Sequence, residues 1–263
     1  MKQLIQIEFL KTKRSFVRYI YLATPFILLL FTLLSILHAN DSNGLYESDG
    51  IIIPVRQASF FNLWPLIISH SIIIIGTYFN LNIDKKSRYL ESCLSNNWNL
   101  ITNFIAKSIV LTFYFALSTL IFSMITIYSV YITTGQVSNF RIIIETAGLI
   151  FFSQICLIQI NITLLRYFNV IIVFILYLIL IIVSVYTVLS DLFWLVPHGY
   201  GLKIAMIMMG IHPNGIPLEI NDIHYSQIGD MYSLYLTMMG SFIFFLIAFA
   251  INIATLHYKK QFL

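Results

Sequence analysis

Six histidines are the side chains of this sequence best suited to acid–base chemistry or metal binding. They form no His-Glu-x-x-His motif, and the chain also lacks the Gly-Lys of a Walker A loop and any Gly-x-Ser-x-Gly motif. His38 and His70 fall near the outer ends of predicted membrane spans, where they either share a metal ion or make separate structural hydrogen bonds. We expect the second, and therefore no catalytic residue and no metal site, since the histidines are scattered: His38, His70, His198, His212, His224 and His257.

Ionisable side chains inside apolar segments would indicate an ion pathway or a proton relay. Only Glu145 and Lys107 approach these segments, and both can lie at span ends. This argues against an ion channel or a proton-coupled carrier. Uncharged polar side chains within the segments fit either hydrogen bonds between helices or the wall of a substrate path: Asn80, Ser118, Ser123, Thr126, Gln154, Gln159 and Asn161.

The elements that carry these side chains follow from the composition. Hydrophobic residues make up 59% of the 263 and charged residues 10%, whereas soluble domains have about 45–50% and about 25%. Such a chain needs lipid as the solvent for much of its surface. We predict one all-α membrane domain over 1–263, with six transmembrane helices at about 18–39, 63–83, 105–133, 143–165, 168–190 and 231–257.

The distribution of basic residues predicts the orientation. The net charge of +4 reflects Lys and Arg beside the apolar segments, which indicates topology and not nucleic-acid binding. With both termini in the cytoplasm, Arg56, Arg141 and Lys203 lie outside, and the other twelve of the 15 basic residues lie inside. We also expect an aromatic belt near the interfaces, formed by Tyr19, Tyr21, Trp64, Tyr78, Trp98 and Trp194.

Three segments lie outside the six predicted spans. Residues 1–16 mix apolar and basic side chains and predict an interfacial helix on the inner leaflet, with its basic side toward anionic lipid. Residues 84–103 form the longest cytoplasmic loop, where 84–95 predicts a short amphipathic helix that docks on a partner or, alternatively, a solvated connector. Residues 191–230 are apolar but broken by Gly and Pro, which favours an external re-entrant segment over a seventh span.

This order of segments resembles the ABC-2 type permease subunits of ABC transporters. The stretch from Ser87 to Leu94 followed by Asn103-Phe104-Ile105-Ala106-Lys107 is similar to that family's charged loop, coupling helix and Lys entering the third span. Residues 8–14, Glu-Phe-Leu-Lys-Thr-Lys-Arg, are similar to its opening. In size and loop pattern the chain resembles permeases of lantibiotic immunity transporters, which expel bacteriocin peptides and confer antibiotic resistance.

The resemblance implies that ATP hydrolysis and transport are carried out by different subunits. ATP and Mg would bind a separate ABC ATPase subunit, and this chain would bind no cofactor itself. The coupling residues would be Arg88, Leu90, Glu91 and Leu94, and the interfacial helix would use Phe9, Lys11, Lys13 and Arg14. A second permease subunit, identical or a sister chain, would complete the path in a bacterial cell membrane.

Two other functions remain open from the residues alone. A membrane-embedded enzyme acting on lipid or peptide predicts His, Asp, Glu or Cys clustered at one depth. A non-transporting membrane partner predicts no ATPase that responds to substrate.

Overall fold

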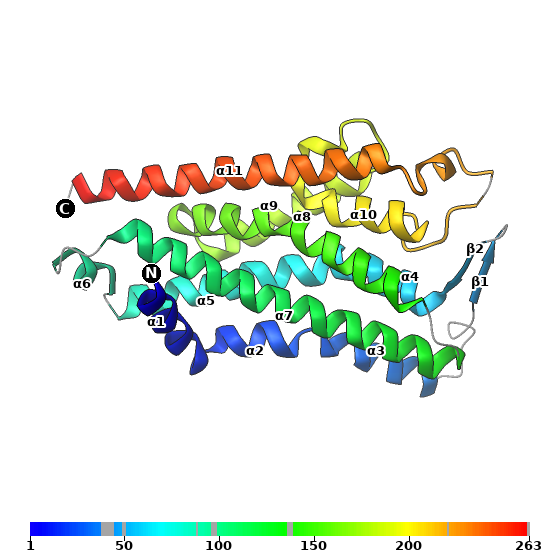
Figure 1. Ribbon diagram of the computed structural model, residues 1–263, viewed down its shortest axis with the longest axis horizontal. Helices are drawn as coiled ribbons and strands as arrows, with labels where there is room; N and C mark the ends of the chain where they lie inside the picture. The colour runs from blue at the N-terminus through cyan, green and yellow to red at the C-terminus, as the bar shows by residue number, and fades with distance from the viewer. Residues whose placement is uncertain are drawn as a thin grey trace.

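The computed structural model describes residues 1–37, 45–48, 51–87, 89–95, 99–135, 139–219 and 221–261, which are predominantly helical. Long helices run side by side along the long axis of the molecule (Figure 1). In chain order the main elements are α1 (Lys2–Lys13), α2 (Phe16–Ala23), α3 (Phe26–Leu37), β1 (Leu45–Ser48), β2 (Ile51–Pro54), α4 (Val55–Leu63), α5 (Ser69–Lys86), α6 (Tyr89–Ser95), α7 (Leu100–Thr134), α8 (Phe140–Tyr167), α9 (Val170–Thr187), α10 (Tyr200–Met209) and α11 (Met231–Gln261).

Five described stretches are long and apolar enough to cross a membrane: Val55–Lys86, α7, α8, α9 and Met231–Leu256. A sixth crossing results if α2 and α3, which meet at an angle of 42°, count as one span. The bend falls at Pro25, which has no N–H to donate to the preceding turn. The predicted all-α class is confirmed, and the apolar helices are consistent with a multi-pass membrane protein. The sixth crossing and the limits of each span stay predictions.

The stretch Val55–Lys86 is interrupted by a π-helical turn, η2 (Trp64–Ile68), at Pro65. There the Trp64 ring stacks on Phe122 of α7, with centroids 4.4 Å apart, and is fully buried. Tyr21 is also fully buried and stacks on Tyr114. The belt prediction was therefore wrong for Trp64 and Tyr21, because both rings fill the space between helices.

Helix α8 lies at the centre of the bundle, packed against α5, α7, α10 and α11. The helices differ sharply in how far they are covered. In their most apolar stretches, 56% of α7 and of α8 is buried, but only 17% of α9 and of α11. Since these exposed side chains are apolar, α9 and α11 present surfaces suited to lipid or to another membrane helix.

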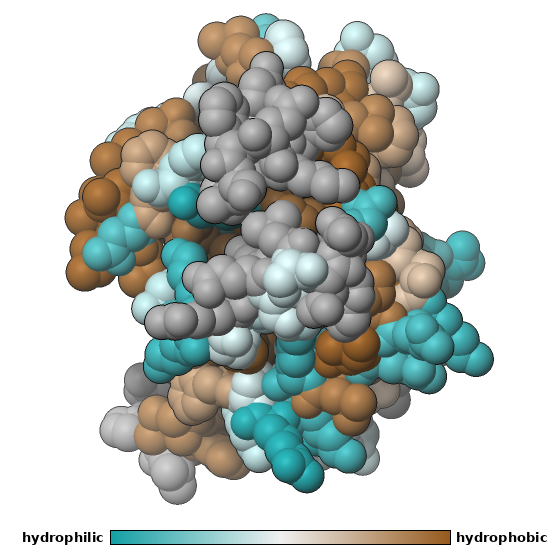
Figure 2. Space-filling view, turned by 90° about the vertical axis from the view of Figure 1, so that its left-hand side faces the viewer, coloured by the Kyte–Doolittle hydropathy of each residue, from teal (hydrophilic) through white to brown (hydrophobic). Residues whose placement is uncertain are grey.

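The two ends of the bundle differ in content. Figure 1 shows α6 and both chain termini toward one end, and the β1–β2 hairpin at the other. The hairpin is antiparallel, with Tyr46 opposite Ile53. We call the end that carries α6 and both termini the α6 end. Figure 2 views the molecule from this end and shows hydrophilic residues among hydrophobic ones.

The apolar segment 191–230 packs against the bundle. Short 3₁₀ turns, η3 (Phe193–Leu195) and η4 (Pro197–Gly199), lead into α10, which is almost wholly buried against α8 and α11. Gly201 is required there, because an added Cβ would lie 2.5 Å from Pro65. The segment ends with a bridge between Ile211 and Pro217 and the turn η5 (Tyr225–Gln227). The turn η4 and α10 are therefore covered by protein, whereas Leu192, Trp194 and Ile223 are exposed, and the depth of the segment in a membrane stays a prediction.

Candidate functional site

Four charged side chains meet at the α6 end and form the candidate site, which we call the charge network. Lys11 Nζ donates to Glu8 Oε1 at 2.5 Å and to Asp84 Oδ1 at 2.9 Å. Lys107 Nζ lies 2.7 Å from Asp84 Oδ2 and 3.6 Å from Glu8 Oε2. Lys107 also donates to Asn80 Oδ1 at 2.5 Å. The two ammonium groups thus share the two carboxylates.

Helical spacing places these groups. Glu8 and Lys11 are three residues apart on α1, and Asn80 and Asp84 are four apart on α5, so each pair shares a helix face. Lys107 lies about two turns into α7, opposite both pairs. The network therefore joins three helices that are distant in the sequence.

The charged groups of the network are buried, so each needs a partner of opposite charge. The exposed fractions of the Glu8, Asp84 and Lys107 side chains are 0%, 3% and 5%. A buried ion pair contributes little net stability, but removing one partner costs about 3–5 kcal/mol because a charge stays uncompensated. Two positive and two negative groups balance here, so each member depends on the others.

Helix α1 docks on α7 beside the network. The Phe9 ring packs edge-on against Phe113 at 5.2 Å, and the Thr12 and Tyr114 hydroxyls hydrogen-bond at 3.2 Å. Figure 1 shows α1 running across the bundle axis. Of the four predicted interfacial residues, Phe9 and Lys11 therefore contact protein, while Lys13 and Arg14 are exposed.

Helix α6 contacts the network through a ring. The Tyr89 ring lies over Lys11, with Nζ 3.4 Å from the centroid, which is a cation–π geometry. One turn further on, Cys93 is buried and free. Burial is the main cause that raises the pKa of the Tyr89 hydroxyl and of the Cys93 thiol. The first turn of α6 is thus held to α1.

The predicted coupling residues lie in and beside α6. Arg88 lies outside the described residues. Leu90, Glu91 and Leu94 belong to the helix, but their side chains lie outside the described part of the structure. Their role in coupling stays a prediction.

Sequence reasoning missed most of the network. It placed Glu8 on an interfacial helix and Asp84 in a cytoplasmic loop, whereas both are buried between helices. It placed Lys107 at a span end, and the structure adds that this side chain is buried too. Glu145, the other ionisable residue expected near a span end, is 46% exposed and paired with Arg141 at 2.7 Å. The sequence did contain a signal for the pair of Asp84 and Lys107. Asp84 lies at the end of one apolar segment, and Lys107 lies early in the next one.

Several interior polar residues make hydrogen bonds inside the bundle. Gln154 Nε2 donates to the Pro65 carbonyl at 3.4 Å, and Gln159 Oε1 lies 3.5 Å from the Ser108 hydroxyl. The hydroxyls of Ser123 and Thr126 bond to carbonyls of their own helix, four residues earlier. Gln154 and Gln159 therefore bond between helices, whereas Ser123 and Thr126 bond within α7, so the choice between helix–helix bonds and the wall of a substrate path stays open.

Two histidines meet in the opposite half of the bundle. The His70 and His198 rings stack with centroids 5.5 Å apart, and the Tyr177 ring lies edge-on 4.4 Å from His198. His38, the partner considered for His70, lies outside the described residues. Among the described residues no group of three or more His, Cys, Asp or Glu side chains could hold a metal ion.

The fold and the charge network together describe a helical protein with several described helices apolar enough to cross a membrane and a buried cluster of charged side chains toward one end of the bundle. Comparisons with protein-family models, curated proteins and solved structures find no match.

Proposed function

We propose that this chain is the permease subunit of an ABC-2 type ABC transporter, driven by a separate ATPase subunit. The substrate class is an amphipathic peptide such as a lantibiotic or other bacteriocin, moved out of the membrane or the cell. In this proposal both termini lie in the cytoplasm of a bacterium, and a second permease chain, identical or a sister, completes the path.

The contact between Tyr89 and Lys11 is the observation that carries the proposal. A coupling helix must transmit force from an ATPase to the spans. Through Lys11, α6 is linked to Asp84 at the end of α5 and, through Asp84, to Lys107 on α7. A displacement of α6 would therefore act on both helices.

The uncovered helices support the proposed pairing. The family expectation puts the first, second and fifth spans at the second permease subunit. α9 corresponds to the fifth and exposes most of its apolar side chains. A partner helix packed there would bury a surface that otherwise faces lipid.

The test is co-purification in mild detergent with an ABC ATPase encoded beside this chain. Deletion of 87–95 and the charge reversal Glu91→Lys are expected to abolish ATPase binding while membrane insertion persists. Glu145→Lys, at an exposed position outside α6, is the matched control and should bind as the wild type does. Retention of the ATPase by both α6 variants would contradict the coupling role.

A membrane-embedded enzyme is the second candidate, and the His70–His198 pair is the observation that favours it. Alanine substitution of each should abolish turnover of a lipid or peptide under that hypothesis and leave transport intact under ours. A non-transporting partner protein would bind an ATPase whose activity no peptide stimulates.

A further inference from the structure

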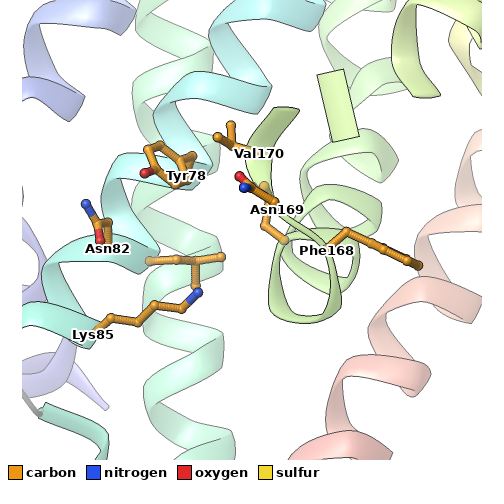
Figure 3. Close-up of a pocket in the computed structure, with 8 residues that line it drawn as sticks. Tyr78, Asn82, Lys85, Phe168, Asn169 and Val170 are labelled. Atoms are coloured by element: carbon orange, nitrogen blue, oxygen red, sulfur yellow. The ribbon is translucent and has the colours of Figure 1, made fainter. Parts of the chain in front are cut away.

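A pocket separate from the charge network lies between the last turns of α5 and the α8–α9 hairpin. It has a volume of about 240 Å³. Helix α5 contributes Tyr78, Asn82 and Lys85, and the hairpin contributes Phe168, Asn169 and Val170 (Figure 3).

The polar groups of this pocket suit an anion. Figure 3 shows Lys85 extending from α5 toward the hairpin and Asn169 lying across the same space. The ammonium of Lys85 and the amide of Asn169 are hydrogen-bond donors, whereas Figure 3 shows the Asn82 amide turned away from the hairpin. No carboxylate belongs to the described lining. Asp84, next in sequence to Lys85, is already engaged by Lys11 and Lys107. The pocket therefore carries an uncompensated positive charge.

The surroundings of the pocket are apolar. Phe168 is 49% exposed beside it, and along α9 the side chains of Ile171 and Ile175 are 64% and 53% exposed. Headgroup donors at one end of an apolar helix surface match an amphiphile with an anionic head and a hydrocarbon tail. A free phosphate ion would satisfy the donors but leave this surface uncovered.

We propose that the pocket binds the phosphate group of an anionic phospholipid, whose acyl chain lies along the exposed face of α9. Lys85 supplies the charge, and Asn169 supplies a donor from the hairpin. The lipid would thereby join α9 to α5, which otherwise meet through the small apolar cluster of Ile74, Leu165, Val173 and Tyr177. This inference does not depend on the transport proposal.

Native mass spectrometry of the detergent-purified full chain tests this, with phosphatidylglycerol and phosphatidylcholine added at equal concentration. The wild type is expected to retain phosphatidylglycerol preferentially. Lys85→Gln should lower its affinity about tenfold, the effect of losing one charge-assisted hydrogen bond of about 1.4 kcal/mol. Lys85→Arg should keep the preference.

Lys86→Gln is the matched control, because Lys86 is the exposed neighbour on α5 and does not line the pocket. Both positions are exposed, so both variants should fold, which size-exclusion chromatography checks. Equal retention of the two lipids, or equal loss in both Gln variants, would overturn the proposal. Displacement of the lipid by an equal concentration of inorganic phosphate would also overturn it, since the site would then be one for a free anion.

Discussion

Lys107 at the α6 end and Lys203 in the segment at the opposite end are both buried, yet their surroundings differ. Lys107 faces two carboxylates, Asp84 and Glu8. Lys203 on α10 donates to the Val188 carbonyl at 3.1 Å and to Gln227 Oε1 at 2.6 Å. The first lysine is paired directly with carboxylates, whereas the second bonds to uncharged oxygen acceptors, and Asp230 and Asp191 act on it only from beyond ion-pair distance.

This difference affects what each end can do. In the charge network, three helices hold complementary charges, so moving one helix exposes charges on the others. At the opposite end, burial lowers the pKa of the Lys203 ammonium to about 8 from its ordinary 10.5. That lysine connects α10 to the end of α9 and to the 3₁₀ turn η5, and its charge depends on pH. The α6 end is thus suited to transmit motion between helices. The opposite end is suited to hold the segment 191–230 against the bundle.

The largest expected effect comes from Lys107→Met. The substitution keeps much of the side-chain volume but leaves Glu8 and Asp84 with only Lys11 as counter-charge. We expect a loss of about 3–5 kcal/mol in the free energy of unfolding, measured by denaturant titration in detergent.

Two further variants make this result specific. Adding Asp84→Asn should restore part of the loss, because Glu8 and Lys11 then balance. Lys13→Met, at an exposed position on α1, should change stability by less than about 0.5 kcal/mol. If Lys107→Met were as mild as Lys13→Met, the network would not be the electrostatic unit described here.

Lys203→Met should have a smaller effect, about 1 kcal/mol near neutral pH. It leaves the two acceptors unpaired but also removes the penalty of burying the ammonium group. Between pH 8 and pH 10.5 the unfolded chain binds more protons at Lys203 than the folded chain does, so the stability of the wild type rises with pH through this window.

Thermal unfolding of both proteins from pH 8 to pH 10 checks the sign. The difference between the wild type and Lys203→Met should widen as pH rises, since the variant lacks this titration. A constant difference would mean that Lys203 keeps an ordinary pKa, and the contrast between the two ends would fail.

The sequence was sufficient for the features that depend on composition and local pattern. Apolar segments of about 20 residues predict membrane helices, and those centred on α7, α8 and α9 lie where helices occur in the structure. The bend at Pro25 and the π-helical turn at Pro65 were not predicted, although the missing N–H group of each proline interrupts the helical hydrogen bonds there.

The candidate site depends on contacts that no local pattern encodes. Glu8 in an amphipathic helix has the same local signature whether it faces headgroups or Lys107, and the choice depends on how α1 docks on α7. His70 likewise meets His198 only because the segment before α10 folds back into the bundle. Trp64 and Tyr21 follow the same logic, because an aromatic residue near a span end fits an interface and a helix contact equally well.

The most local expected effect concerns the docking of α6 on α1. Tyr89→Leu removes the cation–π contact with Lys11 and should weaken docking of α6 by about 1 kcal/mol. Cys93 reports on this locally, because its thiol is buried and its pKa is raised by burial, so alkylation by a maleimide is slow in the wild type. A loss of about 1 kcal/mol should speed labelling of Cys93 about fivefold.

Cys156, fully buried in α8, is the internal control for this labelling and should be unaffected. Tyr89→Phe keeps the ring but removes the hydroxyl that lowers the pKa of Cys93, so it should label no faster than the wild type. If Tyr89→Phe accelerated labelling as much as Tyr89→Leu, the hydroxyl and not the ring would hold α6. The charge network would then end at Lys11 and would not extend to the helix proposed to meet the ATPase, which would make the α6 end as self-contained as the opposite one.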